Sequence, residues 1–402
     1  MILKYYQGKR SLMTQKVDAI VIGGGVMGAS ILYNLASKGL KNCVLLERDT
    51  LGSGSTGRSS GLIRMHYSTR VNAELSWKSF PYFLHFDELI GQQKPQFIKT
   101  GFIAIAGPDS KEGLMKNVSI QKEVGIDTEI IDLKQANEVA PGFNFNDDEV
   151  FAWEPQSGHG DPSGTAMAYA KQAEQLGAKI VLKSPAEQIE LRKNKVFAVH
   201  TEKETYETEI AILATGPWSS QFLSKLDIEL PLTATRHEVF LIKRQGNQLQ
   251  NHPSGADMTN MTYFRPEGND MTLVGNGNRE HVANPDQYNP KPSMDYLEDV
   301  WLRLTKRKPS ITEGQYFTGY AGLYTSTPDT HPIVDKIDGF DGLYICTGFS
   351  GHGFKLAPAV GICMSELIID GKVDFVDINP LKADRFSKGK QNQISYEFRV
   401  IG

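Results

Sequence analysis

The sequence is poor in cysteine, in long apolar runs and in net charge, and each shortage excludes a class of protein. Its three cysteines, Cys43, Cys346 and Cys363, lie in separate apolar runs without CxxC or metal-ligand spacing, which predicts buried, reduced thiols. No run approaches the roughly 18 uninterrupted apolar residues of a membrane-spanning helix. A net charge of −4 over 402 residues, with no basic cluster longer than Lys306–Lys308, argues against nucleic-acid binding and against attraction to anionic membranes.

The length of the chain and its N-terminal sequence indicate the number of domains and the location of the protein. A chain of 402 residues is long enough for two or three domains, which can be interleaved rather than serial. The N-terminal stretch MILKYYQGKRSLMTQK lacks the apolar core of a signal peptide. Together with reduced thiols, this predicts a cytoplasmic location.

Apolar periodicity predicts a βαβ unit near the N-terminus. Residues 1–16 show no periodicity, which is compatible with a disordered extension. From Val17, the stretch VDAIVIGGGVMGASILYNLASKGLKNCVLLER has the order apolar strand, glycine-rich turn, amphipathic helix and second apolar strand. This order is typical of a parallel strand pair joined by a helix.

The remaining patterns alternate between helical and sheet-rich segments. Helical spacing over 71–90 is interrupted by Pro81, and a strand (KTGFIAIAG) precedes a helix around 110–124. Asp161 or Ser163 is placed to cap a helix that leads into another strand. Three β-rich runs follow between 186 and 216, and residues 230–320 have antiparallel character with one helix near MDYLEDVWLRLTKR.

These patterns predict an α/β protein, α+β overall. A Rossmann-like βαβ nucleotide-binding domain is interleaved with a mostly antiparallel, sheet-rich second domain. The nucleotide-binding domain is expected to comprise 17–90, 151–225 and 318–386, and the second domain 91–150 and 226–317. Residues 387–402 are expected to form a C-terminal tail.

The glycine-rich turn carries a dinucleotide-binding motif. Gly23, Gly25 and Gly28 match G-x-G-x-x-G after a strand and before a helix, so the backbone can approach a pyrophosphate at the helix N-terminus. Glu47 ends the second strand, where a carboxylate binds the ribose hydroxyls. The next loop, RDTLGSGSTGRSSG, consists of small residues that can wrap a second, bulkier moiety, which favours FAD over a nicotinamide cofactor.

Four motifs together carry a family resemblance: LGSGSTGRSSGLIRMHYS, EIAILATGPWSS, GLYTSTPDTHPIVD and LYICTGFSGHGFKLAP. From about Val17 to Phe386, the chain resembles the D-amino-acid oxidase superfamily of flavoproteins. The closest branch contains sarcosine oxidases (their β subunits included) and the dimethylglycine and proline dehydrogenases. The resemblance implies an FAD-binding domain, a sheet-rich substrate domain over the flavin, and oxidation of an amine or amino acid.

The resemblance also implies which residues hold the cofactor. The turn before Lys355 would lie at the pyrimidine edge of the flavin, where a helix N-terminus stabilises negative charge. The residues implied to surround FAD are Gly23, Gly25, Gly28, Glu47, Arg48, Ser55, Thr56, Ala214, Thr215, Gly216, Trp218, Gly322, Gly351, Gly353, Phe354 and Lys355.

Two cations are implied to bind the substrate. Arg64 and Lys355 match the positions that bind the substrate carboxylate in the sarcosine oxidase branch, and a guanidinium suits bidentate recognition of that group. Two nearby positive charges also disfavour the ammonium form of a bound amine, whose lone pair must be free for hydride loss. Further candidates for the pocket wall are His66, Tyr67, Tyr263 and Arg265.

The chain departs from the family pattern in two ways. Gly322 of GLYT occupies the position of the cysteine that attaches flavin in monomeric sarcosine oxidases, and GSGSTGRSSG lacks the histidine used by dimethylglycine dehydrogenase-like enzymes. FAD is therefore expected to be non-covalent. The oxygen-activating lysine of monomeric sarcosine oxidase aligns with an apolar or small residue of DMTLVG, which favours a dehydrogenase over an oxidase.

The predicted reaction is oxidation of a carboxylate-bearing amine such as sarcosine, dimethylglycine or proline. Hydride transfer to flavin N5 would give an imine that hydrolyses. An electron acceptor or partner subunit is compatible with this prediction, and neither a metal nor nucleic acid is expected. The alternatives are a 2-hydroxy-acid dehydrogenase and a flavin-carrying electron-transfer subunit. A third alternative is a tRNA-modifying enzyme, although the net negative charge argues against it.

Overall fold

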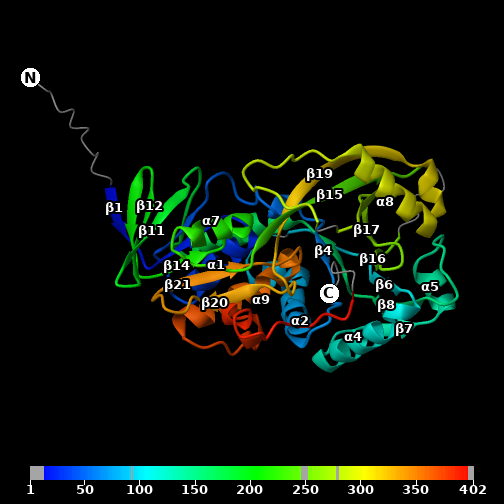
Figure 1. Ribbon diagram of the computed structural model, residues 1–402, viewed down its shortest axis with the longest axis horizontal. Helices are drawn as coiled ribbons and strands as arrows, with labels where there is room; N and C mark the ends of the chain where they lie inside the picture. The colour runs from blue at the N-terminus through cyan, green and yellow to red at the C-terminus, as the bar shows by residue number, and fades with distance from the viewer. Residues whose placement is uncertain (1–12, 92, 94, 246–251, 278–279, 397–402) are drawn as a thin grey trace, which may run out of the picture.

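The computed structural model describes residues 13–91, 93, 95–245, 252–277 and 280–396. The molecule is elongated, with two halves side by side (Figure 1). A six-stranded sheet forms the centre of one half, and an eight-stranded sheet forms the other. The predicted α/β class with a second, sheet-rich part is confirmed.

The six-stranded sheet is the parallel sheet predicted from the N-terminal βαβ unit. Its order is β10-β3-β2-β14-β21-β20, and every pair is parallel except β20 with β21. The inner strands are buried on both faces, which explains their uninterrupted apolar sequences. The strands are β2 (Ala19–Ile22), β3 (Cys43–Leu46), β10 (Lys179–Val181), β14 (Ala211–Leu213), β20 (Ile333–Lys336) and β21 (Leu343–Thr347).

Three helices cover one face of this sheet. Helix α1 (Val26–Ser37) packs between α6 (Pro162–Gln175) and α9 (Gly353–Ile369), and α2 (Arg70–Leu84) packs on α9. The side chain of Asp161 caps α6 by accepting from the Gly164 N–H at 2.9 Å, so the predicted cap is Asp161. Pro81 lies inside α2, which continues to Leu84 before the short α3 (Phe86–Leu89).

A four-stranded sheet packs on the opposite face through a shared apolar cluster. Its order is β1-β13-β12-β11, and β1 (Met13–Lys16) pairs in parallel with β13 (Glu204–Glu207). The end of the expected disordered extension is therefore a strand, because a parallel partner supplies its hydrogen bonds; residues 1–12 lie outside the described residues. The other strands are β11 (Ala186–Arg192) and β12 (Lys195–Thr201).

The eight-stranded sheet is antiparallel except where β16 meets β6, as predicted for the second half. Its order is β19-β15-β18-β17-β16-β6-β8-β7. Helix α8, the helix predicted near MDYLEDVWLRLTKR, packs on β17 and β18. The elements are β6 (Phe102–Ala106), β7 (Glu129–Ile131), β8 (Val150–Glu154), β15 (Thr233–Lys243), β16 (Ser254–Asp257), β17 (Thr262–Glu267), β18 (Met271–Gly275), β19 (Gln315–Ser326), α4 (Lys111–Val124), α5 (Leu133–Val139) and α8 (Met294–Arg307).

A small sheet joins the halves, and the strands run across the predicted domain boundaries. The order of this sheet is β4-β9-β5, with β4 (Leu62–Ile63), β5 (Phe97–Lys99) and β9 (Gly158–Gly160), and α7 (Ser219–Ser224) follows β14. The predicted boundary at 317/318 falls inside β19, which runs from the eight-stranded sheet to the parallel half. In the part of the chain that the structure describes, no helix is long and apolar enough to span a membrane.

Candidate functional site

A cavity of ≈ 540 Å³ opens where the strands of the parallel sheet end. Gly23 follows β2, Glu47 follows β3 and Ala214 follows β14, and all three line the cavity. Ligands of open α/β sheets bind outside the carboxyl ends of the strands. The topology therefore places a ligand cleft at this edge.

The glycine-rich turn is packed too closely for side chains. The Gly23 backbone has φ +114°, and a Cβ on Gly28 would lie 1.9 Å from the Gly23 carbonyl oxygen. Gly25 stands at the N-cap of α1 without a side-chain cap. Val26 and Met27, in the first turn of α1, line the cavity, and the N-terminus of a helix favours a bound phosphate.

The Glu47 carboxylate is held by the backbone beside this turn. One oxygen accepts from the Gly24 N–H and the other from the Asp49 N–H, each at 2.7 Å. Only 9% of the residue is exposed. An oriented, partly buried carboxylate at the end of the second strand can accept ribose hydroxyls.

The small-residue loop folds over the N-terminus of α1. Thr56 Oγ1 accepts from the Val26 N–H at 3.1 Å, and the Ser55 hydroxyl donates to the Leu323 carbonyl at 2.7 Å. The Arg58 guanidinium donates to the Gly54 carbonyl at 3.1 Å. These bonds hold the loop as a wall of the cleft, against the start of α1 and the strand β19.

Asp286, from the loop that precedes α8, holds the outer rim of the cleft together. Its carboxylate accepts from Trp218 Nε1 at 2.7 Å and from Arg48 Nη1 at 3.0 Å. The Arg48 guanidinium stacks over the Trp218 ring at 3.7 Å from its centroid. Hydrogen bonds from Gln221, Trp218 and Arg48 hold the pKa of Asp286 below its usual value. The sequence carried no signal for Asp286.

The inner end of the cleft meets the N-terminus of α9. The backbone is left-handed at Ser350 (φ +52°) and Gly351 (φ +90°), and a Cβ on Gly351 would lie 2.6 Å from the Tyr324 ring. Lys355 lies in the first turn of α9 and is 6% exposed. Burial, reinforced by the charge of Arg64, lowers the pKa of Lys355 well below its usual value.

A second, smaller cavity adjoins the first and contains both predicted cations. Arg64 is 2% exposed, and its guanidinium lies over the Tyr67 ring at 4.6 Å from the centroid. Burial lowers the pKa of Arg64. The lining residues are Ser60, Leu62, Arg64, Phe102, Ala256, Tyr263, Tyr324, Ser350, Gly351, His352 and Lys355, and four of them, Ser60, Tyr324, Ser350 and Gly351, also line the first cavity.

The structure brings most of the predicted site residues to one of these two cavities. Arg64, Lys355 and Tyr263 line the second cavity. The predicted residues that line the first cavity are Gly23, Gly25, Glu47, Arg48, Ser55, Thr56, Ala214, Thr215, Gly216, Trp218, Gly351, Gly353 and Phe354.

Five predicted residues line neither cavity. Gly28 packs behind the glycine turn, and a Cβ on Gly322 would lie 2.8 Å from the Arg58 side chain. Arg265 donates to the Ser60 carbonyl at 2.5 Å, so it supports the wall from behind. His66 and Tyr67 lie beside Arg64, outside the lining residues.

Sequence reasoning missed several residues of the second cavity. Tyr324 lies in the GLYTSTPDTHPIVD motif, so the sequence could have indicated it as a site residue. Phe102 and Leu62 lie in apolar strands, where the sequence pattern does not distinguish a pocket residue from a core residue. Glu154, outside the lining residues but next to His66 and Met65, lies at the end of β8 with 0% exposure, and burial raises its pKa. Its carboxylate accepts from the Met65 N–H at 2.9 Å and from the Ser157 hydroxyl at 2.6 Å.

The cleft fits a dinucleotide cofactor with a bulky second moiety. A Cβ on Gly216 would project into space with no atom within 4 Å, and Gly216 lines the cavity. The same cavity extends from the glycine turn to the start of α9. No metal-binding group of three or more His, Cys, Asp or Glu side chains occurs within the described residues. The fold and the site together define a flavin-dependent oxidoreductase.

The chain belongs to the DAO family of FAD-dependent oxidoreductases, whose family model matches residues 18–367. FAD is therefore its cofactor. The predicted resemblance to this superfamily is confirmed.

Individual relatives place the chain among amine oxidoreductases. It is 28% identical to the monomeric sarcosine oxidase of Arthrobacter sp. (strain TE1826) over 89% of this chain and 93% of that protein. It is 24% identical to mitochondrial sarcosine dehydrogenase of Mus musculus over 91% of this chain, but the match spans only 41% of that protein. The crystal structure of L-proline dehydrogenase from P. horikoshii superposes with a TM-score of 0.86 and 26% identity, over 94% of this chain and 100% of that chain.

Proposed function

We propose that the protein oxidises a carboxylate-bearing amine where the two cavities meet, with sarcosine, dimethylglycine and proline as the first candidates. The observation that carries this proposal is the pair of buried cations, Arg64 and Lys355, that line one small cavity next to the cofactor cleft. The Lys355 side chain has no hydrogen bond or ion pair to any of the described residues. An anionic ligand would supply the missing partner.

Electrostatics favour a carboxylate as that ligand. Two buried like charges raise each other's free energy, and at an effective dielectric of about 20 a charge about 4 Å away contributes about 4 kcal/mol. A carboxylate between Arg64 and Lys355 relieves this repulsion. Arg64 can bind it through two parallel hydrogen bonds, and Lys355 adds a compact charge.

The same cations prepare the amine for oxidation. A positive environment disfavours the ammonium form, so the bound substrate presents its nitrogen lone pair. The chemistry that bound FAD would supply is acceptance of a hydride from the carbon next to that nitrogen, which would leave an imine for water to hydrolyse. The N–H groups at the start of α9 face the inner end of the cleft and stabilise negative charge there.

The size of the second cavity supports a small substrate. Its free volume is ≈ 20 Å³, and its wall contains the apolar or aromatic side chains of Leu62, Phe102 and Tyr263. A space of ≈ 20 Å³ holds about one water-sized group, so it fits one small group of the substrate, and the rest would extend into the adjoining cofactor cleft. The printed names of the relatives, which include sarcosine oxidase, sarcosine dehydrogenase and L-proline dehydrogenase, agree with this size.

We further propose that the enzyme is a dehydrogenase rather than an oxidase. The proposal is supported by the sequence of β18, MTLVG, which contains no lysine where monomeric sarcosine oxidase has its oxygen-activating residue. Without this charge, reduced flavin should react slowly with oxygen and pass its electrons to another acceptor. Rapid reoxidation by air would contradict this part of the proposal.

An anaerobic titration of the FAD-loaded protein tests the substrate class. Sarcosine, dimethylglycine, proline, glycine and 2-hydroxyglutarate are added in turn while the bleaching of the flavin absorbance is followed, and air is then admitted. We expect bleaching by one of the amines. Bleaching by 2-hydroxyglutarate alone would favour a hydroxy-acid dehydrogenase, for which His352 in the cavity wall is a candidate base. Bleaching by dithionite alone would favour an electron-transfer subunit.

The flavin is expected to be released intact by acid denaturation. Gly322 provides no sulfur, and a side chain at this position would collide with Arg58. Burial also raises the pKa of Cys346, a cysteine that lines the cleft, so its thiolate is disfavoured. After acid precipitation, the yellow colour should be found in the supernatant; a coloured pellet would show covalent attachment.

A further inference from the structure

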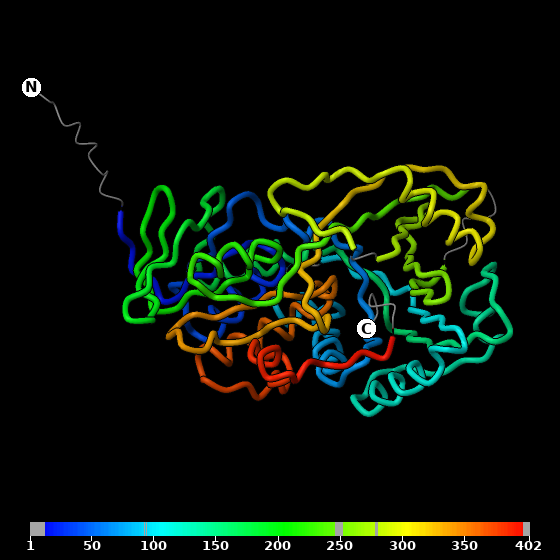
Figure 2. The backbone as a smooth tube through the Cα atoms, viewed as in Figure 1, coloured from blue at the N-terminus to red at the C-terminus, as the bar shows by residue number. Residues whose placement is uncertain are grey.

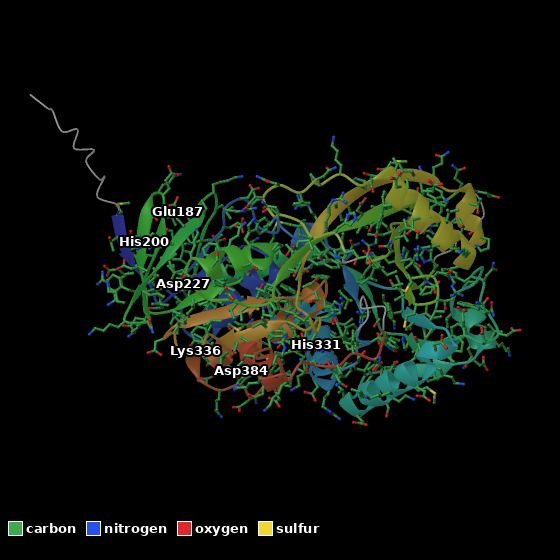
Figure 3. The ribbon with its side chains drawn as sticks, in the orientation of Figure 1. Glu187, His200, Asp227, His331, Lys336 and Asp384 are labelled. Atoms are coloured by element: carbon green, nitrogen blue, oxygen red, sulfur yellow. The ribbon has the colours of Figure 1, made fainter. Side chains whose placement is uncertain are left out.

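The C-terminal segment, residues 370–396 after α9, is anchored by a buried ion pair. The Arg385 guanidinium donates to both oxygens of Asp329 at 2.8 and 3.0 Å, and it also donates to the carbonyl of His331 at 2.8 Å (labelled in Figure 3). Asn392 adds its backbone N–H to the Asp329 carboxylate at 3.1 Å. Asp329 and Arg385 are 5% and 3% exposed. These bonds hold the segment against the FAD-binding half.

From this anchor the segment runs to the half of the molecule that contains the eight-stranded sheet. Figure 2 shows the red end of the chain running from the orange and red helices toward the cyan elements. The Ser395 N–H donates to the Ser68 hydroxyl at 3.2 Å, and a Cβ on Gly113 of α4 would lie 2.8 Å from the Ser395 carbonyl oxygen. Tyr396 is 4% exposed and belongs to an apolar cluster with Leu62 and Phe102, which also line the second cavity.

Tyr396 reaches the residue that holds Arg64. Its hydroxyl forms a hydrogen bond with His66 Nε2 at 2.8 Å, and the two rings stack at 5.9 Å with an interplanar angle of 13°. The backbone carbonyl of His66 accepts a hydrogen bond from Arg64 Nη1. Tyr396, His66 and Arg64 therefore form one chain of contacts that ends at the carboxylate-binding guanidinium.

The other side of His66 faces Glu154 without a hydrogen bond between the two side chains. Its Nδ1 lies 4.0 Å from Glu154 Oε1, and the second oxygen of Glu154 accepts from the Met65 N–H at 2.9 Å. Burial, reinforced by Arg64, lowers the pKa of His66 to about 3. His66 is therefore neutral near pH 7, and its ring contributes a hydrogen bond to Tyr396 and no positive charge.

We propose that Tyr396 is a positioning residue for the substrate site, through which the C-terminal segment sets the orientation of Arg64. The contact acts through His66, because the hydroxyl bond and the stacked ring fix the carbonyl that Arg64 donates to. This inference rests on the proposed function, since it assigns Tyr396 a role in binding the substrate carboxylate.

The test compares two tyrosine-to-phenylalanine variants of the FAD-loaded protein. Tyr396→Phe removes only the hydroxyl at His66. Tyr206→Phe is the matched control, because Tyr206 is also buried and its hydroxyl bonds to Glu204 in the four-stranded sheet, away from both cavities. The probe is methoxyacetate, which has the carboxylate and the shape of an N-methyl amino acid but no oxidisable amine, and its Kd is read from the flavin spectrum.

We expect Tyr396→Phe to raise the Kd of methoxyacetate and the KM of the amine about 5-fold, the effect of one hydrogen bond, with a smaller change in kcat. Tyr206→Phe should leave the Kd of methoxyacetate and the KM of the amine unchanged. The two variants should lower the Tm by similar amounts. A second variant that ends at Ser395 removes the stacked ring as well and should raise the Kd further.

Two other outcomes would contradict this inference or the proposed function. Equal Kd values in wild type, Tyr396→Phe and the shortened chain would show that the segment only stabilises the fold, and would overturn this inference alone. If methoxyacetate does not perturb the wild-type flavin spectrum and no amine bleaches it, the proposed function fails, and the inference fails with it.

Discussion

The two ends of the site, which consists of the cofactor cleft and the small cavity beside it, differ in charge and in the way the chain builds them. At the glycine-rich end, the Glu47 carboxylate is held by the N–H groups of Gly24 and Asp49, all within the first βαβ unit. At the other end, Arg64 and Lys355 come from segments far apart in the sequence and are buried in one cavity. One end is set by local backbone geometry and the other by long-range packing.

This difference determines which changes each end tolerates. The glycine-rich end depends on close backbone contacts, so an added methyl group should disrupt it before any charge is altered. The proposed substrate end contains buried charge, so we expect a variant there to keep its shape and its FAD and still lose the substrate. The predictions below separate these two kinds of dependence, beginning with the largest expected effect.

Gly28→Ala should abolish FAD binding. The new Cβ would lie 1.9 Å from the Gly23 carbonyl oxygen, so either the turn or α1 must move, and overpacking of a buried site costs about 1–3 kcal/mol or more. The measurement is flavin absorbance per protein after purification. Gly107→Ala is the control, since its Cβ would meet only the Thr259 hydroxyl, at 3.8 Å. Normal flavin content in the Gly28 variant would show that the glycine-rich turn tolerates a Cβ at this position and still binds FAD.

Lys355→Met should lower kcat/KM for the amine by roughly 10- to 100-fold, the range for a lost hydrogen bond to a charged group, while FAD stays bound. The variant keeps a long apolar side chain in the first turn of α9. Steady-state kinetics and flavin content are measured together. Lys308→Met is the matched control, because Lys308, at the end of α8, is 4% exposed, burial also lowers its pKa, and it lines neither cavity. Unchanged turnover in Lys355→Met would refute the cation assignment.

Glu47→Gln should weaken FAD binding about 10-fold, since an amide oxygen is a poorer acceptor for the Gly24 N–H and for ribose hydroxyls than a carboxylate. The Kd of FAD is measured by reconstituting the apoprotein. Asp335→Asn serves as the comparison, because Asp335 is also a buried carboxylate, with a bond to the Ala383 N–H at 2.9 Å, and it lies outside the residues that line the cleft. Equal Kd values in wild type and Glu47→Gln would contradict a ribose contact.

Carboxylate binding should weaken as the pH rises. The pKa of Lys355 lies well below 10.5, because of burial and of the charge of Arg64, so the lysine loses its proton at a pH below 10.5. Only the protonated lysine attracts the carboxylate, so the Kd of methoxyacetate should increase by up to about 10-fold per pH unit above that pKa. Lys355→Met should have a flatter profile. A pH-independent Kd in the wild type would mean that Lys355 does not bind the ligand.

The glycine-rich end of the site was predictable from the sequence because its contacts are local. The G-x-G-x-x-G spacing, the apolar strands on either side and the position of Glu47 together specify the turn, α1 and the end of β3. The positions of Arg64 and Lys355 were predictable only through the family motifs around them. Periodicity alone does not distinguish a buried cation in a pocket from a residue in a structural ion pair.

Other features of the site depend on contacts between distant segments. Asp286 closes the rim of the cleft through Arg48 and Trp218, and Tyr396 approaches Arg64 through His66. No local pattern marks these residues, because a side chain in a loop or a tail obtains its role from whatever the fold brings next to it. The amino-acid sequence therefore specified the cofactor and the half of the molecule that binds it. The wall, rim and support of the proposed substrate site were decided by tertiary packing, which places β19, α9 and the C-terminal segment around Arg64 and Lys355.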